Sequence, residues 1–141
     1  MNDTNRTLFL SLLYALQVGA GLWILEAVEG SKIRASHHLD LAPFAAFIGS
    51  STAIPFYFLT FYIIDRACSR MRDQAARSVI QVLTYTAISG WTGHYLFHLL
   101  YEQQEVNEFG LQIETAIILF GMIGLITGTL SEYSRRPPRS K

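Results

Sequence analysis

The fold class is decided by residues 41–64, which read LAPFAAFIGSSTAIPFYFLTFYII and contain no charged side chain. Three further stretches are also free of charge, namely residues 8–25, 78–101 and 115–130. A bilayer core of about 30 Å requires about 20 apolar residues in a helix, and the fourth stretch approaches this length if it begins near residue 111. A helix of a soluble bundle would instead carry polar residues on about half of each turn. We therefore expect four membrane-spanning helices.

The composition agrees with a membrane protein of one domain. Of the 141 residues, 50% are apolar and only 16% are charged, whereas an ordinary soluble domain has about 25% charged residues. Eleven basic and eleven acidic residues balance, so no basic surface for nucleic acid is expected. A single cysteine, Cys68, excludes an internal disulfide and a cysteine-based zinc cluster. We predict an all-α polytopic membrane protein, a single four-transmembrane-helix bundle over residues 1–141 with spans at about 8–28, 41–64, 78–101 and 111–130.

The distribution of basic residues predicts the orientation. Nine of the eleven Lys and Arg residues lie in the N-terminal tail, the second connection and the C-terminal tail, whereas only Lys32 and Arg34 lie in the first connection. The positive-inside rule then places both termini in the cytosol, an N-in/C-in topology in the plasma membrane or the endoplasmic reticulum. Two glycosylation sequons, at Asn2 and Asn5, would favour the opposite orientation. All four histidines and seven of the eleven acids lie at the predicted exoplasmic boundary.

Pro55 lies inside the second predicted span. In a membrane bundle, neighbouring helices can satisfy the carbonyl that a proline leaves without its hydrogen bond, so we expect a kink between Ser51 and Pro55 rather than the end of the span. At the start of the same span, Asp40 followed by Pro43 is typical of an N-cap and a first helical turn.

The third predicted span carries the residues with the most chemistry. His94, His98 and Glu102 are spaced four residues apart, so each side chain lies one helical turn beyond the last, and Trp91 shares their face. Ionisable groups in or near a bilayer are costly and usually face protein or a wet cavity. We therefore expect this histidine stripe, formed by Trp91, His94, His98 and Glu102, to point into the bundle.

Several chemistries suit the histidine stripe. In an acid–base site, His94 and His98 would carry protons to and from a substrate. Glu102, or Glu114 from the fourth span, would orient them, and Trp91 would offer its π face to a developing cation. In a metal site the two histidines would be ligands, while a haem site lacks an axial histidine on another predicted helix. The alternative is an interfacial aromatic belt, with Glu114 as a first-turn carboxylate favoured by the helix dipole.

Uncharged polar residues inside the spans allow two interpretations. Gln17, Ser51, Tyr85 and Ser89 would line a polar cavity that binds a ligand, or they would form hydrogen bonds between helices. We expect neither a metal nor a cofactor in such a cavity.

Small residues recur at helical spacing in two spans. Gly124-x3-Gly128 in the fourth span and Ala15-x3-Gly19 in the first allow close approach of helices. They predict tight helix pairs within one chain, with a homo-oligomer through Gly124 and Gly128 as the alternative.

The layout of four spans with cytosolic ends, a second span that contains Pro55-Phe56-Tyr57-Phe58, and a short basic connection resembles the sterol isomerase and sigma-2 receptor group of small membrane proteins. The resemblance implies that His, Glu and Trp side chains act within the bundle on sterol-like ligands. The carboxylates of that group's second span have no counterpart here, because residues 41–64 contain no acid. Membership is therefore not claimed.

Two classes of function follow from these patterns. The first is a membrane-embedded acid–base enzyme of the isomerase or cyclase type, acting on a lipid- or terpenoid-like substrate. The second is a non-catalytic four-helix membrane protein, such as an accessory, immunity or small-transporter subunit, that acts through helix contacts. In both classes the expected partner is a membrane lipid or an apolar small molecule.

Overall fold

The structure is a computed structural model that describes residues 3–33 and 42–135. Within these ranges the chain forms helices and turns and no strand, which confirms the all-α prediction. His37, His38 and the N-cap predicted at Asp40 lie outside the described residues. The helical elements are α1 (Asp3–Val28), the 3-10 helix η1 (Gly30–Lys32), α2 (Ala42–Thr52), α3 (Ile54–Cys68), α4 (Gln74–Leu100), α5 (Gln103–Phe109) and α6 (Ile113–Tyr133).

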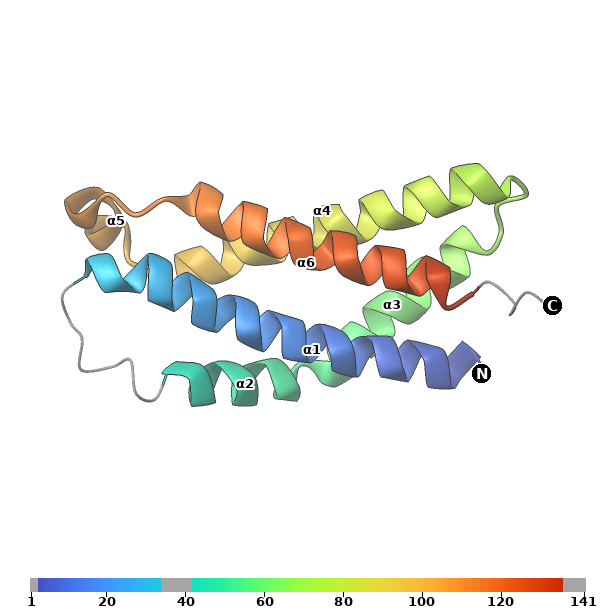
Figure 1. The fold of residues 1–141 in the computed structure, drawn as a ribbon, viewed down its shortest axis with the longest axis horizontal. Coiled ribbons are helices and arrows are strands. Elements are labelled where there is room, and N and C mark those ends of the chain that lie inside the picture. The colour runs from blue at the N-terminus through green and yellow to red at the C-terminus, as the bar shows by residue number, and fades with distance from the viewer. Residues whose placement is uncertain (1–2, 34–41, 136–141) are drawn as a thin grey trace.

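The long helices lie side by side in an elongated bundle (Figure 1). Helix α6 packs along α4, and α1 contacts α2, α3 and α6. The start of α1, the end of α3, the start of α4 and the end of α6 lie together at one end of the bundle, whereas η1 and α5 lie at the other (Figure 1). Four helix ends therefore meet at the first of these ends, and only those of α3 and α4 are close in sequence. We call it the arginine end.

Capping residues explain where α4 begins and where α5 ends. The Asp73 carboxylate accepts a hydrogen bond from the backbone N–H of Ala75 at 2.9 Å, and this N-cap begins α4. Helix α5 ends at Gly110, whose φ of 63° is the left-handed conformation that glycine adopts at helix C-termini. The first signal separates α3 from α4 and the second separates α5 from α6, in both cases without a long loop.

The kink predicted near Pro55 is confirmed. Helix α2 ends at Thr52, α3 begins at Ile54, and Pro55 occupies the first turn of α3. The segments Ala46–Thr52 and Ile54–Cys68 are bent by 52° relative to each other. A proline cannot donate a backbone hydrogen bond and its ring crowds the preceding turn, so the helix breaks at this point.

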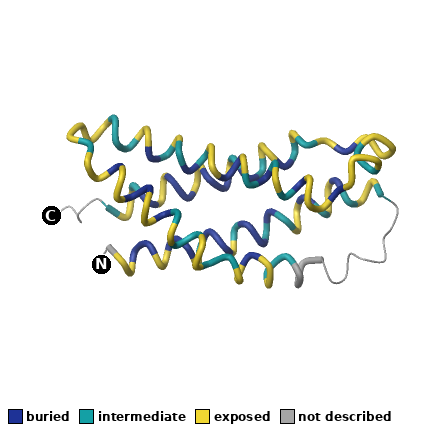
Figure 2. The backbone as a smooth tube through the Cα atoms, turned by 180° about the vertical axis from the view of Figure 1, so that it is seen from behind, coloured by how far each residue is buried: buried dark blue, intermediate teal, exposed yellow. Residues whose placement is uncertain are grey.

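Two helices are long and apolar enough to cross a membrane, with a third if the bent pair counts as one span. The candidate spans are Thr4–Lys32, Ile113–Tyr133 and the bent pair that ends at Cys68. Helix α4 has 27 residues but is less apolar, because Gln, Thr, Ser, Gly and His residues recur along it. Large apolar side chains such as Leu16, Leu83 and Ile118 are exposed and suit contact with lipid. Exposed positions recur along the helices (Figure 2).

The tight helix pairs predicted from small residues are confirmed within one chain. A Cβ atom at Gly124 would lie 2.7 Å from the Cβ atom of Ser89, and one at Gly128 would lie 3.0 Å from the Cα atom of Val82, so α6 touches the backbone of α4. The small-residue face that sequence left open to a second copy is thus occupied by α4 of the same chain. In α1, a Cβ at Gly19 would lie 2.5 Å from Cδ1 of the Phe47 ring of α2.

A buried carboxylate joins helices at the other end of the bundle. Glu29 follows α1 and is only 1% exposed. Its carboxylate accepts hydrogen bonds from Lys32 Nζ at 2.7 Å, from the backbone N–H of Gln112 at 3.0 Å and from the Thr115 hydroxyl at 2.7 Å. Because the last two donors lie at the start of α6, Glu29 ties the end of α1 to that helix.

Candidate functional site

Asp65 is the centre of a buried ionic cluster at the arginine end. Its carboxylate pairs with Arg6 of α1 and with Nη2 of Arg135, which follows α6, the latter at 2.7 Å. It also accepts a hydrogen bond from Gln81 Nε2 of α4 at 3.1 Å. The side chains of Asp65, Arg6 and Arg135 are 10%, 7% and 11% exposed. One carboxylate therefore links all four segments that meet here.

Helical periodicity places Asp65 inside the bundle. Phe61, Ile64, Asp65 and Cys68 are the buried residues of α3, and their spacing puts them on one face of that helix. The apolar members of this face bury the helix against its neighbours and carry the carboxylate with them. This periodicity could have indicated that Asp65 is buried, but it does not identify the arginines that pair with it, which the sequence analysis used as a signal of membrane topology.

A cavity of about 520 Å³ lies beside the ionic cluster. Its wall contains four arginines (Arg6, Arg66, Arg77 and Arg135) and one acid (Asp65), and every other lining residue carries a hydroxyl group (Thr4, Thr7, Tyr62, Ser69 and Ser134). We call this cavity the arginine pocket. Four guanidinium groups against one carboxylate leave a formal excess of three positive charges.

Several guanidinium groups of the arginine pocket keep unused donors. Arg6 Nε, Arg77 Nε and Arg135 Nη1 are buried and have no hydrogen-bond partner among the described residues. A buried N–H group without a partner is costly, and arginine has donors only. The pocket is therefore suited to an acceptor with several negatively charged oxygens, because arginine pairs with phosphate or carboxylate through parallel charge-assisted hydrogen bonds.

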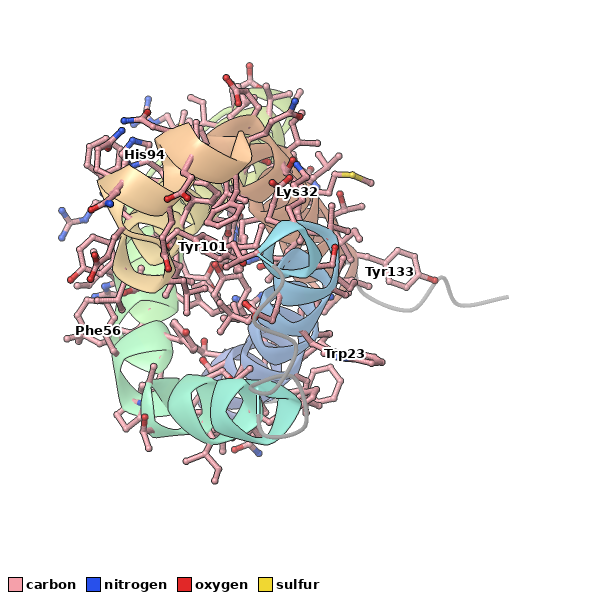
Figure 3. The ribbon with its side chains drawn as sticks, turned by 90° about the vertical axis from the view of Figure 1, so that its left-hand side faces the viewer. Trp23, Lys32, Phe56, His94, Tyr101 and Tyr133 are labelled. Atoms are coloured by element: carbon pink, nitrogen blue, oxygen red, sulfur yellow. The ribbon has the colours of Figure 1, made fainter. Side chains whose placement is uncertain are left out.

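The histidine stripe is present on α4 but faces outward, so the prediction that it points into the bundle is wrong. Trp91 is 74% exposed, His98 is exposed and His94 is half-buried, and Figure 3 shows His94 at the outer edge of the bundle. The reason is that α4 packs on α6 through its small residues: a Cβ at Gly93 would lie 2.6 Å from the Ala116 carbonyl oxygen. The larger residues of the stripe occupy the remaining, outer face.

The rings of the stripe contact one another along α4. Trp91 and His94 are stacked, with centroids 5.8 Å apart and planes at 17°, and His94 meets His98 edge-on at 4.8 Å. The two predicted carboxylates are both exposed: Glu102 directly precedes α5, and Glu114 lies in the first turn of α6. The part of the chain that the structure describes contains no group of three His, Cys, Asp or Glu side chains close enough to hold a metal ion.

Two of the four polar residues predicted to line a cavity, Gln17 and Ser89, form hydrogen bonds between helices instead. The Ser89 hydroxyl is 2.8 Å from the Tyr14 hydroxyl of α1, and Gln17 Oε1 accepts from the Thr127 hydroxyl of α6 at 2.7 Å. Tyr85 is fully buried between the helices, whereas Ser51 is exposed on α2. These bonds support the second of the two interpretations, in which polar side chains join the helices.

Comparison with known proteins yields no relative: no family model, no curated protein and no solved structure matches this chain.

Proposed function

We propose that this protein is a four-span membrane protein, with both termini in the cytosol, that binds a phosphate-bearing anion in the arginine pocket. The observation that carries the proposal is a cavity lined by four arginines and one acid, in which three of the arginines have a buried nitrogen without a hydrogen-bond partner among the described residues. A phosphate group offers three acceptor oxygens and up to two negative charges, which fit this donor set and the excess of positive charge. A single carboxylate would satisfy fewer of the donors.

The topology in this proposal follows from charge and packing. The arginine end includes the N-terminal turn, the α3–α4 connection and the end of α6, which are the segments that hold most of the basic residues. The positive-inside rule assigns such segments to the cytosol. We assign α4 as the fourth span. Its 27 residues are more than the about 20 that a helix needs to cross the hydrocarbon core, and it packs along the candidate span α6.

A binding role has more support than acid–base catalysis at the histidine stripe. Catalytic acids and bases act on a substrate held in a site that excludes water, and His94 and His98 lie on the outer face of α4. The second class expected from sequence, a non-catalytic membrane protein, accommodates the arginine pocket directly. Trp91, His94 and His98 then serve as residues of an interfacial belt.

Exchange of Arg77 for glutamine is expected to weaken binding of inorganic phosphate by about tenfold or more, because it removes a charge-assisted hydrogen bond worth about 1.5–3 kcal/mol. Arg77 makes no ion pair with Asp65, so the buried cluster stays intact. Binding is measured on protein purified in detergent, as the rise of the thermal midpoint with phosphate at constant ionic strength. The matched control is Arg72→Gln, which makes the same charge change at an exposed position outside the pocket. Equal phosphate affinity of the two variants would contradict the proposal.

Exchange of His94 and His98 together for alanine is expected to leave phosphate affinity and membrane abundance unchanged, since neither side chain lines the pocket and their ring contacts are with residues of α4 itself. Immunoblots of membrane fractions and the same phosphate titration provide the measurement. Loss of a cellular activity at normal abundance, with phosphate binding intact, would restore the acid–base hypothesis.

A further inference from the structure

The arginine pocket lies at the ends of the candidate membrane spans. One candidate span begins at Thr4, another ends at Tyr133 and the bent pair ends at Cys68. Thr4 itself lines the pocket, and the other two ends are followed directly by the lining residues Ser69 and Ser134. The headgroups of a bilayer begin where its hydrocarbon core ends. In the topology proposed above, the pocket therefore lies at the depth of lipid phosphates.

The pocket is continuous with apolar surface on the membrane side. Tyr62 lines the pocket and is 51% exposed, and its ring stacks on Phe58, which lies one helical turn farther from the arginine end, with centroids 6.5 Å apart. Leu59 and Ile63, on adjacent positions of the same helix, are exposed as well. A phosphate held by the arginines could therefore carry an acyl chain that runs along α3 in the hydrocarbon region.

The size and charge of the pocket indicate which kind of lipid headgroup it would bind. Its volume of about 520 Å³ is in the range of about 300–1,000 Å³ typical of small-molecule sites. A phosphate monoester carries a charge of about −1.5 to −2 at neutral pH, whereas a phosphodiester has only one ionisable oxygen. The formal excess of three positive charges in the pocket favours the monoester.

Resting on the proposed phosphate-binding function, we infer that the ligand of the arginine pocket is a phospholipid of the surrounding leaflet whose phosphate is a monoester. Arg6, Arg77 and Arg135 line the pocket, and each has a buried donor without a partner among the described residues; in this inference their guanidinium groups hold the phosphate oxygens. Tyr62 and the apolar face of α3 lie along the lipid tails. Basic pockets between membrane helices bind anionic headgroups in this manner.

The test compares lipids that differ only in their headgroup. The protein is reconstituted in phosphatidylcholine vesicles that contain a minor fraction of phosphatidic acid or of phosphatidylglycerol, extracted again in detergent, and examined for bound lipid by native mass spectrometry. We expect retention of phosphatidic acid above phosphatidylglycerol, and no enrichment of phosphatidylcholine. Arg77→Gln should lower the retention of phosphatidic acid by about fivefold, the effect of one arginine near an anionic lipid. Arg72→Gln should leave it unchanged.

A phosphate titration of the same samples separates this inference from the proposed function. If inorganic phosphate binds in a manner that depends on Arg77 and phosphatidic acid is not retained, the natural ligand is soluble and the lipid inference is wrong, while the proposed function stands. Equal retention of phosphatidic acid and phosphatidylglycerol also contradicts the inference. If Arg77→Gln alters neither phosphate binding nor lipid retention, both proposals are wrong.

Discussion

Exchange of Asp65 for asparagine is expected to destabilise the protein by about 3–5 kcal/mol, the cost of removing one partner from a buried ion pair. Asparagine preserves the shape of the side chain and its hydrogen bond with Gln81, but it removes the negative charge that Arg6 and Arg135 share. Two buried guanidinium groups would then repel each other at the arginine end. The midpoint of thermal denaturation in detergent is the measurement.

Two further variants identify the cause of this loss. Glu108→Gln removes an exposed carboxylate from α5 and is expected to leave the midpoint unchanged. The double variant Asp65→Asn/Arg6→Gln is expected to recover part of the stability, because it removes one of the two uncompensated charges. Added phosphate should stabilise Asp65→Asn more than the wild-type protein, since a bound anion restores the missing charge. Equal midpoints of Asp65→Asn and the wild type would show that the ionic cluster does not hold the helices together.

Exchange of Gly124 for alanine is expected to separate α4 from α6 and to cost about 1–3 kcal/mol, the usual penalty of overpacking a well-filled interior. The new Cβ atom would lie 2.6 Å from the Ser89 hydroxyl oxygen and even closer to the Tyr85 carbonyl oxygen. The carbonyl belongs to the backbone of α4, so no side-chain rotation relieves the clash. The helices must move, which also disturbs the hydrogen bond between Ser89 and Tyr14.

The matched control for this variant is Gly121→Ala in the same helix. No atom lies within 4 Å of a Cβ atom at Gly121, and alanine is favoured over glycine in a helix interior by about 1 kcal/mol. We therefore expect Gly121→Ala to be neutral or slightly stabilising. Thermal denaturation of both variants, together with the rate of exchange of the α4 amides, tests the difference. A loss at Gly121 as large as that at Gly124 would mean that α6 packs in another way.

The predictions that succeeded rest on local chemistry. Pro55 breaks a helix wherever its missing N–H and its ring fall inside one, and the 52° bend between the segments that flank Ala53 follows from this. The spacing of Gly124 and Gly128 in the sequence predicted the close approach of α6 to a neighbouring helix, which is α4. Each of these features is encoded within one helix.

The orientation of the histidine stripe could not be predicted in this way. Spacing places Trp91, His94 and His98 on one face of α4, and the structure retains that arrangement. Which face turns inward depends on the neighbouring helix, and α6 packs against the side that carries Gly90 and Gly93. The expectation that ionisable groups avoid the outer face does not hold for His94 and His98. Both lie near the end of α4, where the side chains of a membrane-spanning helix can reach the interface.

Long charge-free stretches of sequence were enough to predict an all-helical chain with candidate membrane spans. The reason is that the backbone hydrogen bonds of a helix form within the segment itself, whatever surrounds it. The arginine pocket is different in kind. Arg6, Asp65 and Arg135 are 59 and 70 residues apart along the chain, and only the packing of α1, α3 and α6 brings them together. An ion pair between distant segments has no periodicity to reveal it, because its partners are chosen by the geometry of helix packing.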